Sequence, residues 1–520
     1  MTQPRRQPGS DRVSQALPDL ATAPAVGIAL SLAGLLIALS TRYGYHRDEL
    51  YFLAAGKHLA WGYPDQPPFV PLIARAMSAL APGSLLVLRL PAAIASAALV
   101  LLTAMIAREL GAERRAQLLA ALAIAIAPLV IGAGHLLSTT TFGLPAWALC
   151  CWLILRILRT GNDRLWLLVG VAAGGGLFDS DLIAFLLFAI VAGLAISGPR
   201  RPFRSVWLYA GGAVAVALWA PYLAWQAAHG WPELAIARSI ATGGSGTSAP
   251  RWALLPFAFG LFGYLAPVWV AGLVRLLRGG ELRWCRAFGI AFIVLVIVFT
   301  VTGGKPYYLG GMVPVLVGAG VQPTLDWVRR GRAAEDSPGS SLRAGTAWRA
   351  WLITGAVALT LTALPITLPL VPVADLHATP VVSLNYDAGE TVGWPAYVRE
   401  IASVYRSLPA SRRAAAIVLG SNYGEAGAVL RYGPADGLPA AYSGHNGFWY
   451  WGPPPAWATT AIAVGFGRSQ LARFCGTLRL AAHLNNHVAV HDDEQGAPVW
   501  VCSSLRAPWA VIWPRLRAFG

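Results

Sequence analysis

Long apolar runs separated by polar loops constrain this chain more than any other feature of its sequence. A helix that crosses the hydrocarbon core of a bilayer needs about 20 predominantly apolar residues. Eleven runs approach that length, the fifth being the shortest: 24–42, 84–107, 117–134, 141–158, 165–178, 181–197, 206–226, 252–274, 285–302, 308–325 and 350–371. The pattern predicts a polytopic, mainly α-helical membrane protein.

Composition supports this prediction and excludes another class of protein. Charged residues make up 12% of the 520 residues and hydrophobic residues 56%, whereas a soluble protein has about a quarter of its residues charged. The net charge of +16 comes from short arginine clusters between apolar runs, which is typical of membrane topology signals and not of a continuous nucleic-acid-binding face.

The arginine clusters also predict the orientation of the chain. They precede the first run and follow the second, fourth, sixth, eighth and tenth, within 5–12, 108–115, 156–164, 200–204, 275–286 and 329–349. Because positive loops favour the cytoplasmic side, every second loop is predicted to be cytoplasmic. Residues 1–22 are predicted to be a disordered cytoplasmic N-terminus followed by an uncleaved anchor, and the C-terminal region is predicted to be extracytoplasmic.

The chain changes character at about residue 374, where hydropathy falls and turn residues multiply. Residues 414–419 and 461–464 predict buried strands, each followed by a helix-like stretch. We therefore expect a transmembrane domain over 23–373 and a small extracytoplasmic α/β domain over 374–520. Cys475 and Cys502 lie in this domain and are predicted to form a disulfide in an oxidising compartment, whereas the other three cysteines lie in apolar runs.

An acidic pair in the first outer loop, 43–83, is the strongest local signal for chemistry. Asp48 and Glu49 follow the first apolar run, and carboxylates at a membrane boundary favour a water-filled cavity. One of them could act as the general base that glycosyl transfer requires. The alternative is a solvated pair that caps a helix beginning there.

Cationic and aromatic residues accompany this pair in the predicted outer loops. Arg47, Lys57, Arg89 and Lys305 are suited to phosphate, although Arg89 could instead extend toward the interface and Lys305 could anchor a helix end. His135 is a candidate site residue or a packed polar one. The remaining aromatic candidates fit a sugar platform or an interfacial aromatic belt: Trp61, Tyr63, Tyr307 and Tyr308.

Several of these segments together resemble glycosyltransferase family 39, the GT-C-fold enzymes that include protein O-mannosyltransferases and lipid A aminoarabinose transferase. The first outer loop carries the more specific motif, GYHRDELY at 44–51 with PDQPP at 64–68. Supporting segments are GHLLS at 134–138, GGKPYY at 303–308, NYGEAG at 422–427 and SGHN at 443–446. The resemblance covers nearly the whole chain.

This resemblance implies an inverting transfer of a sugar from a polyprenyl-phosphate donor to a lipid, glycan or protein acceptor on the outer face of the cell membrane. Asp48 takes the place of the catalytic base, and Glu49 would assist or help to bind a divalent cation (Mg²⁺ or Mn²⁺) where one is used. Arg47, Arg89 and Lys305 would contact the donor phosphate. The other residues expected at the substrate are His46, Tyr63, Asp65, His135, Tyr307, Tyr308, Asn422, Glu425, His445 and Asn446, of which the four C-terminal ones could equally hold loops inside their own domain.

The resemblance also predicts an architecture. The first outer loop should form short helices on the membrane surface, and the C-terminal domain should cap the active cavity. Two segments depart from the family pattern: Thr139 and Thr140 stand where an acidic residue is common, and residues 179–181 (DSD) replace a basic run. A lipid-linked-sugar transporter or flippase and an inactive glycolipid-binding relative therefore stay as alternatives, although a transporter site near the bilayer midplane fits the loop positions of these residues less well.

Overall fold

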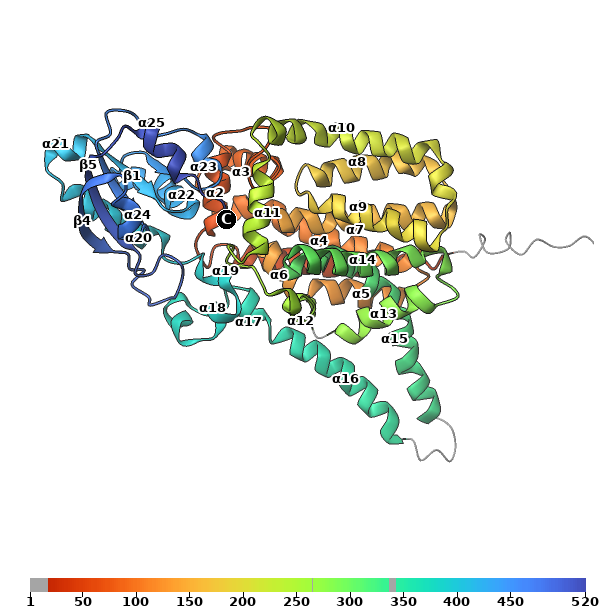
Figure 1. Ribbon diagram of the computed structural model, residues 1–520. Helices are drawn as coiled ribbons and strands as arrows, with labels where there is room; N and C mark the ends of the chain where they lie inside the picture. Colours follow the sequence, from red (N-terminus) through yellow and green to blue (C-terminus); the bar gives the residue numbers. More distant parts are fainter. Residues whose placement is uncertain (1–16, 264, 336–342) are drawn as a thin grey trace, which may run out of the picture.

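The computed structural model describes residues 17–263, 265–335 and 343–520, and its larger part is a bundle of helices (Figure 1). Of the predicted disordered segment 1–22, residues 1–16 lie outside the described residues. The bundle and its outer loops contain α1 (Thr22–Leu39), α2 (Arg47–Ala55), α3 (Phe69–Leu80), α4 (Leu85–Glu109), α5 (Arg114–Ala125), α6 (Pro128–His135), α7 (Thr139–Thr160), α8 (Trp166–Leu177), α9 (Leu182–Ser197), α10 (Val206–Ala228), α11 (Pro232–Ala241), α12 (Leu254–Leu261), α13 (Ala266–Arg278), α14 (Arg286–Thr302), α15 (Val313–Glu335) and α16 (Arg343–Leu361).

Each of the eleven predicted spans has a helical counterpart, but not all of these helices are long enough to cross a bilayer alone. Within the described residues, six helices are long and apolar enough to do so, and up to eight if each bent helix pair is one span. The bent pairs are α5 with α6, at 55°, and the segments Arg251–Leu261 and Ala266–Arg278, at 111°. The chain is a multi-pass membrane protein, and its number of spans stays a prediction.

Small residues let the helices of the bundle cross closely. A Cβ on Gly170 of α8 would collide with the backbone of Gly211 on α10, and a Cβ on Gly272 of α13 would collide with the carbonyl of Leu316 on α15. Close backbone approach at small residues is a common way to pack helices in membranes, where lipid is as apolar as the side chains. These contacts fix the bundle that carries the outer loops.

The first outer loop folds into the short helices α2 and α3, as predicted; their place on a membrane surface stays a prediction. α3 is amphipathic: Val70 and Ala74 are buried, whereas Leu72 and Leu80 are 44% and 72% exposed.

The C-terminal region contains a five-stranded mixed sheet with the order β2-β1-β3-β5-β4. Its strands are β1 (Ala416–Gly420), β2 (Ala441–Ser443), β3 (Thr460–Val464), β4 (Cys475–His483) and β5 (Pro498–Leu505), and its helices and their connections to the bundle are α17 (Leu364–Thr367), α18 (Val381–Leu384), α19 (Tyr386–Gly389), α20 (Trp394–Arg406), α21 (Ala410–Ala414), α22 (Tyr423–Tyr432), α23 (Gly447–Tyr450), α24 (Arg468–Leu471) and α25 (Trp509–Ile512). β1 pairs in parallel with β2 and β3, and β5 is antiparallel to β3 and β4. Both predicted strands are present, as β1 and β3, whereas the domain boundary at 374 stays a prediction.

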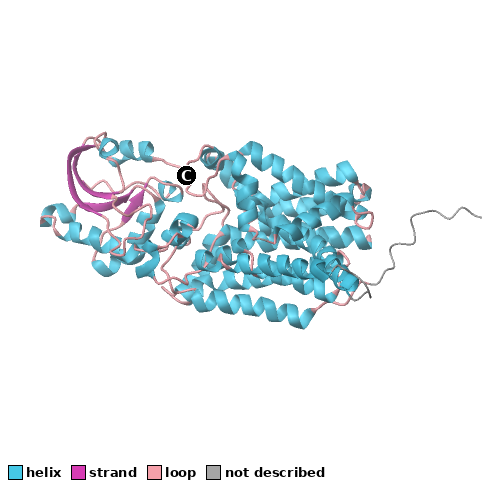
Figure 2. Ribbon diagram, turned by 90° about the horizontal axis from the view of Figure 1, so that it is seen from below, coloured by secondary structure: helices cyan, strands magenta, loops and turns pink. Residues whose placement is uncertain are grey.

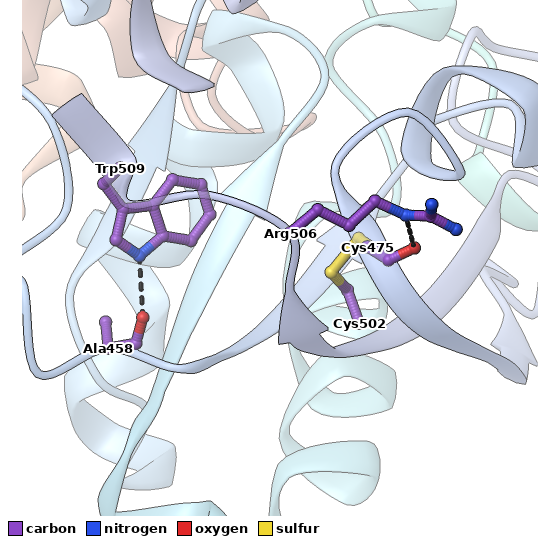
Figure 3. The surroundings of a disulfide bond; sticks show 5 residues. All are labelled: Ala458, Cys475, Cys502, Arg506 and Trp509. Atoms are coloured by element: carbon purple, nitrogen blue, oxygen red, sulfur yellow. Dashed lines mark hydrogen bonds between the residues drawn. A yellow bond between two sulfur atoms is a disulfide. The ribbon is translucent and has the colours of Figure 1, made fainter. Parts of the chain in front are cut away.

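A disulfide joins Cys475 on β4 to Cys502 on β5, as the sequence predicts, with a Cα–Cα distance of 5.6 Å. Figure 3 shows Arg506 beside it, donating from Nε to the carbonyl of Cys475 at 3.2 Å. The bond covalently links two strands at one side of the sheet.

The sheet domain lies at one end of the bundle (Figure 2) and packs on the first outer loop. α2 and α22 lie side by side (Figure 1), and a Cβ on Gly427 of α22 would touch the backbone of Leu50 on α2 at 3.0 Å. Leu50 and Tyr51 share one hydrophobic core with Trp394 and Val429 of the C-terminal region. The side chains of α2 therefore meet both parts of the molecule.

Candidate active site

Three consecutive charged residues at the start of α2 occupy three different environments. Successive helical residues are rotated by about 100°, so Arg47, Asp48 and Glu49 cannot share one surface. His46 caps the helix by accepting a hydrogen bond from the Asp48 N–H, while Glu49 accepts one from the His46 N–H. The predicted capping role thus falls to Glu49, and Asp48 is free for another.

Asp48 is the accessible acid of the pair, with 38% of its side chain exposed. The Tyr423 hydroxyl donates to Asp48 Oδ1 at 2.7 Å, and His46 Nδ1 lies 3.8 Å from Oδ2. Within the described part of the chain, His46 is its one ion-pair partner, and no arginine or lysine neutralises it. The carboxylate is thus oriented by Tyr423 and still partly open to solvent.

Glu49 is fully buried and bound to Arg89. Arg89 donates from Nε to Oε1 at 2.8 Å and from a terminal nitrogen to Oε2 at 2.7 Å, and the Leu137 N–H donates to Oε1 at 3.0 Å. Burial opposes ionisation, but the Arg89 charge and these hydrogen bonds outweigh it and lower the pKa of Glu49. Glu49 therefore ties α2 to α4 and to the start of α7, which argues against a direct chemical role.

The same geometry argues against the predicted phosphate role of Arg89. Its guanidinium also donates to the carbonyls of Ser40 at 2.6 Å and Gly44 at 2.9 Å, and only 2% of the residue is exposed. His135 is also a neighbour of this guanidinium, with Nε2 at 3.4 Å from an Arg89 nitrogen. We therefore assign Arg89 and His135 to the support of the loop and not to the substrate.

Arg47 points from α2 into the C-terminal region. One terminal nitrogen lies 2.6 Å from the Tyr386 hydroxyl, 2.7 Å from Asp493 and 3.2 Å from Glu390, and the guanidinium lies over the Tyr423 ring at 5.0 Å. Two carboxylates thus compete with any phosphate for its charge. Its main role in this geometry is to hold the two parts of the protein together.

Lys305, just before the 3₁₀ turn Pro306–Met312, is the available member of the three predicted phosphate-binding cations. Its Nζ donates to Ser245 Oγ at 2.8 Å and lies 5.8 Å from the centre of the Tyr307 ring. Among the ion pairs of the described residues, none includes Lys305. The pKa of Asp387 is lowered against the effect of burial by the hydrogen bond and charge of His46, whose Nε2 lies 3.5 Å away, and by the charge of Lys305.

Asp65, which precedes α3, is shared between the first outer loop and the C-terminal domain. Tyr51 donates to its Oδ1 at 2.8 Å and Asn446 donates to Oδ2 at 3.3 Å. Burial raises the pKa of Asp65 to about 7, and the nearby charge of Asp48 adds to that rise. The structure thus brings Asp65 close enough to Asp48 for their charges to interact.

The aromatic candidates separate into a structural and a site-facing group. Tyr63 is buried and donates to the carbonyls of Ala55 and His58 at 3.0 and 3.2 Å, so it stabilises the loop and does not face a substrate. Burial raises the pKa of Tyr307, and the charges of Asp387 and Asp48 add to that rise. The ring of Tyr308 packs edge-on against the ring of Tyr307, with ring centres 5.0 Å apart. Tyr307 therefore stays a candidate for sugar contact.

The C-terminal candidates divide in the same way. Asn422 and Glu425 form the capping box of α22, so they hold a helix end. His445 stacks on Tyr423 with ring centres 5.0 Å apart, and burial lowers the pKa of its imidazole to about 4. His445 and Asn446 thus adjoin the hydroxyl and the carboxylates of the site.

A second acidic group lies at the third predicted outer loop. Asp181 accepts a hydrogen bond from Trp219 Nε1 at 2.9 Å, and Tyr222 donates to Glu233 on α11. Burial, together with the Asp181 charge, raises the pKa of Glu233. Asp179 is buried, and its carboxylate has no hydrogen-bond partner among the described residues.

The expected divalent cation does not fit the acidic pair that the sequence singled out. Both oxygens of Glu49 already accept hydrogen bonds from Arg89. Within the described residues, no three His, Cys, Asp or Glu side chains are arranged to hold a metal ion. We therefore derive no chemical step through a metal.

Sequence reasoning missed several residues that the fold brings to the site. Tyr51 and Tyr423 lie inside the motifs at 44–51 and 422–427, so their position beside the acids was the available signal. Asp387 and Glu390 follow the last apolar run, which is the same kind of signal that identified Asp48. Glu233 lies in no motif, and only its contact with Tyr222 of α10 in the folded structure identifies it.

Comparison with known proteins supports the resemblance found in the motifs. Residues 65–225 match the model of a family described as dolichyl-phosphate-mannose-protein mannosyltransferase. A search of curated protein sequences finds no match.

Among solved structures, ArnT from Cupriavidus metallidurans in the apo state aligns with a TM-score of 0.56 at 15% identity, over 92% of this chain and 97% of ArnT. The same protein bound to undecaprenyl phosphate aligns with a TM-score of 0.55 at 17% identity over the same shares. The archaeal oligosaccharyltransferase AglB from Archaeoglobus fulgidus, in complex with an inhibitory peptide and a dolichol-phosphate, aligns with a TM-score of 0.42 at 14% identity, over 74% of this chain and 58% of AglB. The likeness to ArnT confirms the predicted GT-C fold, and the family match over residues 65–225 agrees with the resemblance to family 39.

Proposed function

We propose that this GT-C membrane protein is a glycosyltransferase that moves a sugar from a polyprenyl-phosphate donor to an acceptor on the outer face of the cell membrane, with inversion at the transferred carbon. The division of labour between Asp48 and Glu49 carries the proposal. The structure neutralises Glu49 with Arg89, whereas Asp48 is partly exposed and has no arginine or lysine partner among the described residues, only His46 at 3.8 Å.

In this mechanism Asp48 accepts the proton of the acceptor hydroxyl as the oxygen attacks the anomeric carbon. The bond between that carbon and the phosphate oxygen breaks, and the electron pair stays on the polyprenyl phosphate. Tyr423 holds Asp48 Oδ1, and we assign the proton transfer to Oδ2, which lies 3.8 Å from His46 Nδ1. Of the three predicted phosphate-binding cations, Lys305 is the one with no carboxylate at ion-pair distance among the described residues, and it supplies charge for the leaving phosphate.

A solved structure of similar fold and the family model support the proposed donor class. ArnT has been seen bound to undecaprenyl phosphate, and the family model over residues 65–225 is described by a dolichyl-phosphate sugar donor. The arginine clusters support a cytoplasmic N-terminus, which would place α2, α3 and the C-terminal domain outside the cell membrane, where the disulfide is also expected to persist.

The test is sugar transfer by the purified protein in detergent, offered a panel of polyprenyl-phosphate sugars and membrane-derived acceptors. Asp48→Asn keeps the size and the Tyr423 contact but removes the base, so transfer should fall by about 10²–10⁴-fold. Asp436→Asn is the matched control, because Asp436 pairs only weakly with Arg406 at 3.8 Å in the C-terminal domain.

Transfer that survives Asp48→Asn would refute the assignment of the base. Consumption of no donor across the panel, with polyprenyl phosphate still bound, would favour the flippase or the inactive glycolipid-binding relative over the enzyme.

A further inference from the structure

A cavity of about 190 Å³ lies between the first outer loop and the C-terminal domain, separate from the acidic site. Its walls come from α2, α3, the start of α4 and α22. Leu50, Leu53, Leu88 and Leu430 make the walls apolar, while Lys57 and Arg431 also line it.

The cavity lies on the opposite face of α2 from the proposed base. Counting about 100° per residue, Leu50 and Leu53 are turned by about 200° and 140° from Asp48. α2 therefore separates the two sites, and a ligand in the cavity cannot present an atom to Asp48.

The charges at this cavity are all positive. No Asp or Glu lines it, and within the described part of the chain neither Lys57 nor Arg431 belongs to an ion pair. Arg431 donates weakly to the Gly83 carbonyl at 3.4 Å and lies over the rings of Tyr45 and Tyr432. Its Nε is buried and has no hydrogen-bond partner among the described residues, which leaves a donor for an anion.

Exposed leucines lie close in sequence to residues that line the cavity. Leu59 is 52% exposed, Leu80 72% and Leu86 41%. They adjoin Lys57, the lining residue Ala81 and the start of α4. Apolar side chains exposed beside a cation are typical of a protein surface at the lipid headgroup level.

We propose that this cavity binds the phosphate headgroup of an anionic phospholipid of the surrounding membrane. The ligand chemistry is a phosphate oxyanion next to an apolar group. The two cations would bind the phosphate oxygens, and the leucines would pack against the first carbons of the lipid. At about 190 Å³ the cavity has room for one phosphate headgroup. The Ser78 and Ser84 side chains line the same cavity and can donate to a phosphate.

A lipid phosphate bound in this cavity would strengthen the docking of the C-terminal domain on the first outer loop. Lys57 follows α2 and belongs to the first outer loop, whereas Arg431 belongs to α22. One anion held by both joins the two parts that also form the acidic site, and it relieves the repulsion between the cations. The lipid is therefore expected to raise the stability of the docked state without taking part in transfer.

The experiment measures thermal unfolding of the full chain in nanodiscs of phosphatidylcholine alone, or of phosphatidylcholine with phosphatidylglycerol. We expect phosphatidylglycerol to raise the unfolding temperature of the wild type, and Lys57→Gln with Arg431→Gln to abolish that rise. Arg75→Gln is the matched control: Arg75 is an exposed arginine of α3 that does not line the cavity, so this variant should keep the rise.

A second variant guards against a simple folding defect. Ser78→Leu fills the cavity but keeps both cations, and it should also lose the rise. A rise that persists in the double variant, or one that Arg75→Gln abolishes equally, would overturn the proposal in favour of a diffuse surface effect. Full stabilisation by inorganic phosphate in phosphatidylcholine nanodiscs would overturn the lipid as the source.

Discussion

Replacing Glu49 by glutamine should damage the protein's stability more than its chemistry, and the opposite should hold for Asp48→Asn. The Glu49 carboxylate accepts hydrogen bonds from two Arg89 nitrogens at 2.8 and 2.7 Å and from the N–H groups of His46 and Leu137 at 2.9 and 3.0 Å. Glu49→Gln removes the charge and leaves Arg89, 2% exposed, without its counter-ion. Breaking one side of a buried ion pair costs about 3–5 kcal/mol.

Asp48→Asn should change the free energy of unfolding by less than about 0.5 kcal/mol, because the side chain is partly exposed and the amide oxygen keeps the Tyr423 bond. The assay compares thermal unfolding and sugar transfer for the two variants in one detergent. Glu49→Gln should lower the unfolding temperature by roughly 5 °C or more and, well below that temperature, keep more transfer than Asp48→Asn.

A double variant sharpens the comparison. Glu49→Gln with Arg89→Met removes the orphaned charge, so part of the lost stability should return. Glu49→Gln that unfolds at the wild-type temperature yet loses transfer as fully as Asp48→Asn would refute the division of roles.

Three further outcomes follow from contacts in the C-terminal domain. Tyr423→Phe removes the hydroxyl that orients Asp48, and transfer should fall by roughly tenfold with little change in unfolding temperature; an unchanged rate would contradict the orienting role. Burial raises the pKa of Glu425 from 4.5 to about 7, so the folded state retains a proton that the unfolded chain releases, and stability should fall as pH rises through that window, by roughly 3 kcal/mol at most. Glu425→Gln should flatten this part of the pH–stability curve, and an unchanged slope would assign it to another group. Cys475→Ser with Cys502→Ser removes a crosslink with a sequence separation of 27 and should lower the free energy of unfolding by about 3.5 kcal/mol. The variant should unfold at a lower temperature than the oxidised wild type, and reductant should not change that temperature further. Equal unfolding temperatures of the oxidised wild type and the variant would contradict this prediction.

The sequence predicts the membrane fold well because hydrophobic length and arginine placement are local properties. Every predicted apolar run became a helix, and the strands β1 and β3 appear where short apolar runs predict them. Whether an apolar run crosses the bilayer as one straight helix is not a local property. The pair α5 and α6 bends by 55° at the break before Pro128, so length alone does not settle the number of spans.

The site shows the same boundary between local and long-range information. Asp48 is identifiable because its motif is contiguous, but the buried state of Glu49 depends on Arg89, 40 positions away. Residue type cannot distinguish an arginine that binds phosphate from one that neutralises a carboxylate. Tyr423 was missed as a partner of Asp48 because 375 positions separate them and only the docking of α22 on α2 brings them together.

The three consecutive charges of α2 also limit how this loop can evolve. Arg47 is committed to the C-terminal region, Asp48 to the open site and Glu49 to the bundle. Inserting or deleting one residue just before them would turn the helix by about 100° and mispair all three at once. Change in this segment is therefore expected to proceed by substitution, with Glu49 and Arg89 exchanged jointly, and not by length variation.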